Sequence, residues 1–262
     1  MDWLDNIIKT FFDFDAMWQV FPQLLGVGLV NTLVISIWAT VIGVVLGMIV
    51  AIMGISTSRW LRVPARIYTD VFRGLPAILT ILLIGQGFAR FSQQVFGPSP
   101  YPLGILALSL IASAYIGEIF RAGIQSVDRG QLEACRALGM SYGKAMRLVV
   151  VPQGIRRVLP ALVNQFIAIV KDSSLVYFLG LLVSERELFR VGQDAAVLTG
   201  NLSPLVMAGL FYLVITVPLT HLVNFFDDRF RTGRRKAAPP KSGLDEVEEI
   251  TPVQPLTYGS NT

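Results

Sequence analysis

Long apolar stretches, separated by short charged segments, dominate the pattern of this sequence. Between Ala16 and Ser58 the chain contains no Asp, Glu, Lys or Arg. A helix needs about 20 mostly apolar residues to cross the ~30 Å hydrocarbon core of a bilayer. Because this stretch has no clear polar turn, it predicts an interfacial start around residues 18–22 and one long tilted helix from about Leu24 to Met53.

Four further apolar runs follow. They extend from about Pro64 to Phe91, from Leu103 to about Ile124, from near Val158 onward, and from Leu205 to Phe226. Gly74 and Pro76 interrupt the run that begins near Pro64, and the adjacent charges of Lys171 and Asp172 interrupt the run that begins near Val158. The sequence therefore predicts an all-α membrane protein with about five transmembrane helices.

The composition agrees with an environment of lipid. Hydrophobic residues make up 53% of the 262 residues and charged residues only 15%, whereas soluble domains carry about 25% charged residues. This balance excludes a soluble globular domain and a disordered chain. The single cysteine, Cys135, and the single histidine, His221, supply neither a disulfide nor the paired ligands of a zinc site. We expect no metal and no cofactor in this chain.

The charges of the loops alternate along the chain and predict its topology. The first fifteen residues contain four Asp and one Lys, unlike the positive start of a signal peptide. Positive residues mark the cytoplasmic side of membrane proteins. They gather in residues 59–66, in residues 128–157 with a net charge of +4, and after residue 228, whereas residues 92–102 are uncharged and residues 184–201 have a net charge of −1. We expect the amino terminus outside and the carboxyl terminus inside the cell.

These observations divide the chain into three parts. Residues 1–20 form an extracytoplasmic or interfacial segment, and residues 21–228 form the transmembrane domain, which includes a long cytoplasmic loop at residues 128–157. Residues 229–262 are rich in Pro, Gly and Ser and lack apolar periodicity, so we expect a disordered cytoplasmic tail.

Small residues recur on one face of two predicted helices. They are Ala39, Gly43, Gly47 and Ala51 in the first apolar run, and Ser109, Ser113 and Gly117 in the third. Small side chains let transmembrane helices approach closely. Packing within one helical bundle explains both stripes better than a dedicated dimer face does.

The cytoplasmic loop contains two predicted short helices. Residues 130–138 place Leu132, Cys135 and Leu138 on one apolar face, and Gly139 is suited to end this helix. A second amphipathic helix follows from Tyr142 to about residue 150, and we expect it to stop before Pro152. Two short helices joined at a glycine on the inner face indicate a docking surface for a soluble partner.

This loop resembles the EAA loop of ABC importer permeases. The family pattern of Glu-Ala-Ala, a later Gly and an aliphatic-x-x-Pro ending corresponds to Glu133, Ala134, Cys135, Gly139 and residues 149–152, with Cys135 in place of the second alanine. Residues 72–76 (FRGLP), 118–126 (EIFRAGIQS) and 171–175 (KDSSL) also resemble permeases of polar amino-acid uptake systems. The resemblance covers roughly residues 20–228.

The resemblance implies a permease subunit of the bacterial cell membrane that is not itself an enzyme. Permeases of this family pair with a second copy or a similar permease. They also bind two cytoplasmic ABC ATPase subunits, which hold ATP and Mg, and an extracytoplasmic amino-acid-binding protein. Glu133, Ala134, Cys135 and Gly139 are then the residues expected to transmit ATPase motion to helices that alternate between outward- and inward-facing states. Nothing indicates a nucleic-acid partner.

Ionisable residues at membrane depth are candidates for the substrate pathway, because they are costly unless they face a cavity or each other. The spacing of Asp70 and Arg73, and of Glu118 and Arg121, permits helical ion pairs. The candidate set is Arg73, Gly74, Pro76, Glu118, Arg121, Lys171, Asp172 and Ser173. A zwitterionic amino acid requires both signs of charge, which these residues supply. The same charges are equally compatible with pairing only among themselves. Arg73 is also compatible with a position at the inner interface.

Lys171 and Asp172 are adjacent and therefore cannot share one helix face. We expect one of them to face the pathway and the other to find a partner on another span.

Two other functions fit the sequence less well. A secondary ion-coupled amino-acid transporter requires inverted repeats, and no internal duplication is visible. An intramembrane hydrolase has no identifiable nucleophile, and residues 139–145 lack the spacing and the Ser or Thr of a phosphate-binding loop. Glutamate, glutamine, arginine, histidine and cystine are all compatible substrates.

Overall fold

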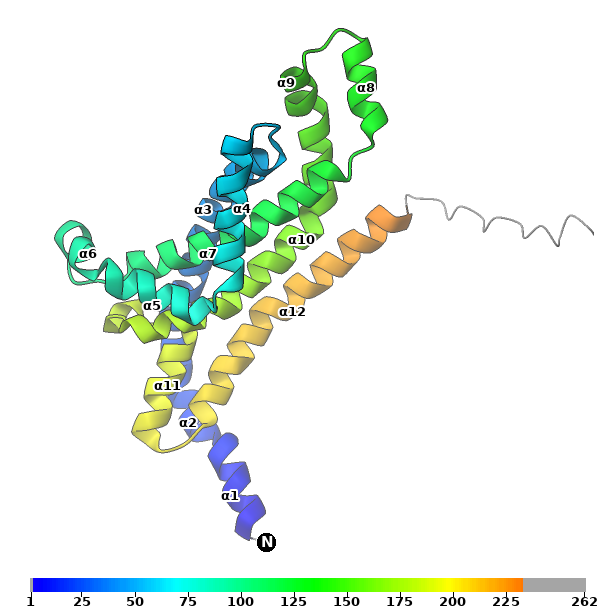
Figure 1. Cartoon of the computed structure of the whole chain (residues 1–262). Coiled ribbons are helices and arrows are strands. Elements are labelled where there is room, and N and C mark those ends of the chain that lie inside the picture. Colours follow the sequence, from blue (N-terminus) through cyan, green and yellow to red (C-terminus); the bar gives the residue numbers. More distant parts are fainter. Residues whose placement is uncertain (1, 233–262) are drawn as a thin grey trace, which may run out of the picture. The chain divides into compact units, whose positions relative to one another are not determined.

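The first apolar stretch folds as a nearly uninterrupted helix in the computed structural model, which describes residues 2–232. After the amino-terminal α1 (Asp2–Phe11), the elements α2 (Phe14–Gln23), the π-turn η1 (Leu24–Gly28) and α3 (Leu29–Ile55) follow one another directly (Figure 1). The carboxylate of Asp13 starts α2 by accepting hydrogen bonds from the backbone N–H of Asp15 and Ala16 at 3.0 and 3.2 Å. The predicted single helix over residues 24–53 is confirmed.

The second apolar run is broken where the sequence predicts a break. α4 (Arg59–Gly74) ends before the extended residues Leu75 and Pro76, and α5 (Ala77–Gly87) leaves at an angle of 106° to it. Proline disfavours helical geometry in the residue before it, which explains the bend. The short helix α6 (Ala89–Phe96) follows.

The third run forms α7 (Tyr101–Gln125), which packs along α3. A Cβ atom at Gly43 would lie 2.9 Å from the Cβ of Ala112, and one at Gly47 would lie 3.0 Å from the backbone N of Gly117. Such distances leave space for glycine alone. The two stripes of small residues therefore meet within this chain, as predicted.

The loop after α7 begins with α8 (Arg129–Ala137), and continues through α9 (Tyr142–Ala145) and a π-turn, η2 (Met146–Val150), into α10 (Val151–Asp172). The prediction that a helix stops before Pro152 is wrong. Pro152 lies in the first turn of α10, and the wide turn of η2, where the N–H of Val151 bonds to the carbonyl of Met146, lets the helix continue.

The last part of the domain contains a hairpin. The 3₁₀ turns η3 (Ser173–Leu179) and η4 (Val183–Glu185) lead to α11 (Leu188–Thr199), and a short turn leads to α12 (Ser203–Thr232). α12 thus extends past residue 228, where the sequence places the end of the domain. Most of the predicted tail, residues 233–262, lies outside the described residues.

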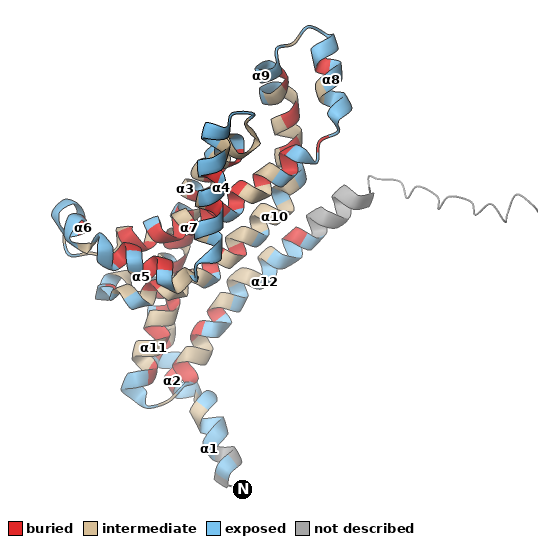
Figure 2. Ribbon diagram, in the orientation of Figure 1, coloured by how far each residue is buried: buried red, intermediate tan, exposed pale blue. Residues whose placement is uncertain are grey.

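The burial pattern places α7 at the centre of the packing and most of α12 at the surface (Figure 2). α3 buries its small residues Ala39 and Ala51, whereas its large residues Val45, Ile49 and Ile52 are half exposed. Large apolar side chains outside and small ones inside suit a helix surrounded by lipid. Counting the bent α4–α5 pair as one span, the described residues contain five candidate spans.

Candidate functional site

A polar cavity of about 270 Å³ lies between α3, α4 and α7. Its ionisable lining residues come from two helices: Arg66, Asp70 and Arg73 from α4, and Glu118 and Arg121 from α7. The small residues Ala51 and Gly117 leave space beside them. Three guanidinium groups and two carboxylates give the lining a formal net charge of +1.

The carboxylate of Glu118 is the centre of this cluster. It accepts hydrogen bonds from Nε and Nη2 of Arg121 at 2.9 and 2.6 Å, and Nη1 of Arg73 lies 3.8 Å from its Oε2. The Arg73 guanidinium also lies over the Tyr115 ring, 5.3 Å from its centre. The Glu118–Arg121 pair that the sequence spacing permits is present, and Arg73 belongs to the same cluster.

The spacing of Asp70 and Arg73 permits an ion pair, but the structure shows none between them among the described residues. Arg73, near the end of α4, instead lies beside the carboxylate of Glu118 on α7. A pair three residues apart on one helix contributes only about 0.2–0.5 kcal/mol, so tertiary contacts outweigh it. Asp70 remains in the cavity without an ion pair among the described residues. The cavity thus offers a carboxylate and positive groups to one small ligand.

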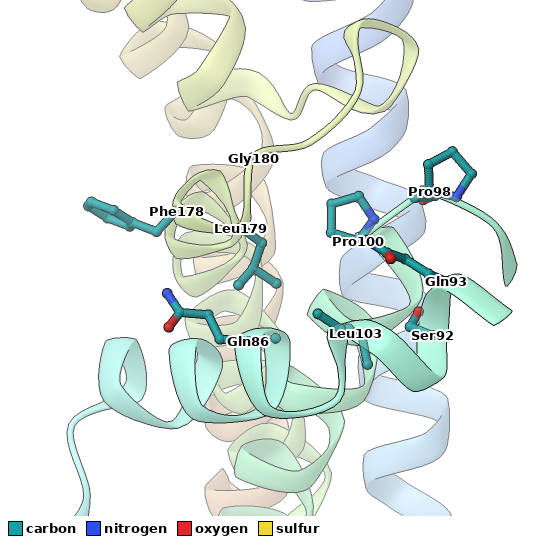
Figure 3. Close-up of a pocket in the computed structure, with 12 residues that line it drawn as sticks. Gln86, Ser92, Gln93, Pro98, Pro100, Leu103, Phe178, Leu179 and Gly180 are labelled. Atoms are coloured by element: carbon teal, nitrogen blue, oxygen red, sulfur yellow. The ribbon is translucent and has the colours of Figure 1, made fainter. Parts of the chain in front are cut away.

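A second cavity, of about 250 Å³, lies between α5, α6, the start of α7 and the end of η3 (Figure 3). Gln86, Ser92 and Gln93 supply polar groups, and Leu103 and Phe178 supply apolar ones. Its lining contains no ionisable side chain. It therefore lacks the charges that a zwitterion requires, and the first cavity is the stronger candidate.

Lys171, Asp172 and Ser173 do not line either cavity. Lys171 is exposed, Asp172 is partly buried at the end of α10, and Ser173 is fully buried, its hydroxyl donating to the carbonyl of Val170 at 2.7 Å. Among the described residues neither charge has an ion-pair partner on another span, contrary to the prediction. Gly74 and Pro76 lie exposed at the α4–α5 bend.

The predicted coupling residues lie on α8, which is capped at both ends. The carboxylate of Asp128 accepts the N–H of Gly130 at 2.7 Å, and Gly139 ends the helix with a φ of +80°. Glu133 and Ala134 are exposed, while Cys135 is buried. The helix and its glycine stop are confirmed.

The predicted apolar face of α8 is divided. Leu132 packs near the cluster of Ile124, Val127 and Val150, whereas the side chain of Leu138 is 83% exposed. Leu138 lies at the end of α8, beyond the reach of this cluster, and Tyr142 and Leu148 are also exposed nearby. Exposed apolar side chains in this loop form a surface suited to a protein partner.

Sequence reasoning missed one buried carboxylate, that of Glu187. It is fully buried directly before α11 and accepts hydrogen bonds from the backbone N–H of Phe189 and Arg190. The mixed charges of residues 185–190 suggested only an exposed loop. The single available signal was an acidic residue immediately before an apolar helix start.

Comparisons with known proteins agree with this architecture. Residues 43–232 match the model of the family "Binding-protein-dependent transport system inner membrane component". The chain is 37% identical over 211 residues to the arginine transport system permease protein ArtQ of Bacillus subtilis, covering 80% of this chain and 93% of that protein. It is 35% identical over 224 residues to the glutamate/aspartate import permease protein GltK of Escherichia coli, covering 83% of this chain and 98% of GltK.

A solved structure has the same fold. The crystal structure of an amino acid ABC transporter with histidines matches with a TM-score of 0.70 and 35% identity, covering 81% of this chain and 96% of that one. The chain belongs to the family of binding-protein-dependent transport system inner membrane components. It is a multi-pass permease subunit of the cell membrane and not an enzyme.

Proposed function

We propose that this chain imports a polar amino acid by alternating access, as the permease subunit of an ATP-driven ABC importer. The observation that carries the substrate class is the cavity between α4 and α7. Arg66, Arg73 and Arg121 suit the carboxylate of an amino acid, and Asp70, which has no ion pair among the described residues, suits its ammonium group. The names of the arginine, glutamate/aspartate and histidine relatives support the same class.

Membership of the family supports the following partners. A second copy or a similar permease completes the pathway, an extracytoplasmic binding protein delivers the amino acid, and two ATPase subunits hold ATP and Mg. We assign the contact with the ATPases to α8, with Glu133, Ala134, Cys135 and Gly139. Its two capped ends and the exposed Leu138 support this assignment, because a short rigid helix in a groove can transmit a rigid-body motion.

Reconstitution tests this function directly. The permease is placed in proteoliposomes with its ATPase, together with the binding protein, and uptake of labelled arginine, glutamate, glutamine and histidine is measured with and without enclosed ATP. We expect uptake of at least one of them only with ATP and the ATPase. Uptake driven by an ion gradient without the ATPase would instead establish a secondary transporter.

Two variants test the cavity in the same assay. Replacing Asp70 with Asn removes the proposed ammonium partner and should raise KM, while membrane insertion stays normal because Asp70 has no ion pair among the described residues to lose. The control is Asp15→Asn, at an exposed carboxylate in the first turn of α2. An unchanged KM in Asp70→Asn would remove this cavity from the pathway.

A further inference from the structure

Glu187 is a fully buried carboxylate at the junction of four elements. Besides its two backbone hydrogen bonds, its Oε2 accepts the hydroxyl of Tyr212 on α12 at 3.1 Å. The Thr32 hydroxyl of α3 accepts the N–H of Leu188 at 3.1 Å. The hydroxyls of Thr32 and Ser173 also lie next to that of Tyr212. A single polar network therefore joins α3, η3, α11 and α12.

The first residues of α11, whose backbone N–H groups bond to Glu187, also contact η3. Phe189 packs edge-on against Tyr177 of η3 with ring centres 5.3 Å apart, and the Arg190 guanidinium lies 4.7 Å from the centre of the same ring. The backbone N–H groups of these two residues are the ones that Glu187 accepts, at 2.5 and 2.7 Å. Glu187 thus fixes the two side chains that hold Tyr177, four residues beyond Ser173.

The carboxylate has few charges around it. Tyr212 and Arg190 are the titratable side chains that face it from the described residues; α3 and η3 contribute only hydroxyls. The Nε of Arg190 lies 2.9 Å from the carboxylate of Asp194, and the Nε of Arg186 lies 3.1 Å from the same carboxylate. Glu187 itself has no ion pair among the described residues. A buried anion without a cationic partner is costly, so protonation competes with its charge.

We propose that Glu187 is a positioning residue of the transport cycle, which holds η3 and the preceding residues 171 and 172 against α11 and α12. Its protonation state sets how readily α11 separates from them. A charged carboxylate gains far more hydration free energy than a neutral one when the junction opens. The transport part of this inference rests on the proposed function; the structural part does not.

Burial raises the pKa of Glu187 from its usual value of 4.5 to about 7, against the opposing effect of the backbone N–H groups of Phe189 and Arg190 and of Tyr212. Glu187 lies between the candidate spans Tyr142–Leu179 and Ser203–Asn224. Since the closed junction binds the proton more tightly than an open, hydrated one, rising pH favours opening. The effect is largest between pH 4.5 and 7 and levels off above that range.

Amide hydrogen exchange of the purified chain in nanodiscs tests the structural part. After correction for intrinsic exchange, opening at Phe189 and Arg190 should increase by up to about tenfold per pH unit between pH 5 and 7. Glu187→Gln keeps an acceptor oxygen but cannot titrate, and should abolish this pH dependence. Asp15→Asn, at an exposed carboxylate of another helix start, should retain it. A step that persists in Glu187→Gln would overturn the inference.

Tyr212→Phe gives an independent variant. It leaves Glu187 able to titrate and should keep the pH dependence of α11, while exchange around Ser173–Tyr177 increases, because it removes the hydroxyl that bonds to Glu187 and lies next to Ser173 of η3. Unchanged exchange there would contradict the positioning of η3.

ATP-driven uptake measured from pH 5.5 to 8 completes the test. Glu187→Gln should lose the pH dependence of the wild-type rate below pH 7, and an identical profile would overturn the transport part. If the wild type shows no ATP-driven uptake at any pH while the exchange results hold, the proposed function fails and the assignment of Glu187 as a positioning residue stands.

Discussion

Gly139 shows how one residue sets the direction of the chain at the end of a helix. Its φ of +80° lies in the left-handed region, and the N–H of Met140 bonds back to the carbonyl of Cys135 at 3.1 Å. Other L-residues pay roughly 1–2 kcal/mol in this conformation. The chain can therefore turn sharply after α8 only with glycine at this position.

We predict that Gly139→Val strongly reduces ATP-driven uptake, because relief of the strain would redirect the chain at the end of α8. The protein should remain in the membrane, since an added Cβ has no atom within 4 Å to strike. Gly143→Val is the matched control, as Gly143 is helical and equally open. Uptake and membrane level are measured together; equal uptake in both variants would argue against coupling through α8.

Asp172 provides a second test at this scale. It is partly buried and has no ion pair among the described residues. If it serves transport, Asp172→Asn should lower uptake per folded molecule with little change in melting temperature. Loss of one member of a buried pair would instead cost about 3–5 kcal/mol of folding free energy and lower the protein level. A loss of uptake fully explained by unfolding would remove Asp172 from the candidate pathway.

The contact between α3 and α7 determines the packing at the scale of elements. Lipid is as apolar as leucine, so two apolar helices associate through close approach and not through burial of apolar surface from water. Gly43 and Gly47 supply that approach on α3, and the serine hydroxyls on α7 bond within their own helix, as Ser109 does to the carbonyl of Ile105 at 2.6 Å. The helices meet without unsatisfied polar groups at these positions.

Gly47→Leu should therefore lower the thermal stability of the purified protein. The new Cβ would meet the backbone N of Gly117 and the backbone O of Ser113 at 3.0 Å each, and backbone atoms cannot move aside as a flexible side chain can. Overpacking of this kind costs about 1–3 kcal/mol. Gly209→Leu on α12, where an added Cβ meets nothing within 4 Å, is the control. Equal melting temperatures of the two variants would contradict the packing argument.

At the scale of the whole molecule, loop charge and loop structure together allow a sharper test of topology. The natural thiol, Cys135, is buried and is a poor target for labelling. In a Cys135→Ser background, Leu138→Cys and Leu198→Cys replace side chains that are 83% and 87% exposed. We predict that a membrane-impermeant thiol reagent labels intact cells at residue 198 only, and that a permeant one labels both. Labelling of residue 138 from outside would reverse the topology.

Much of this protein follows from the sequence alone. The length of the apolar runs predicted the spans, because the thickness of the bilayer sets the length of a spanning helix. Gly74 and Pro76 predicted the α4–α5 bend and Gly139 the end of α8, because these residues restrict or permit backbone conformations at their own positions. The resemblance of the loop and of three other segments to ABC permeases predicted the family.

The tertiary structure decided which charges meet. Sequence spacing permitted Asp70 as the partner of Arg73, yet Arg73 lies beside Glu118. The helix also continues through Pro152 at the π-turn η2, where the sequence predicted an end. Glu187 reads as one charge of an exposed loop until α3, η3 and α12 close around it. Local propensities are set by a few neighbouring residues, whereas the environment of a charge depends on side chains far apart in the sequence, whose positions are fixed only when the helices pack.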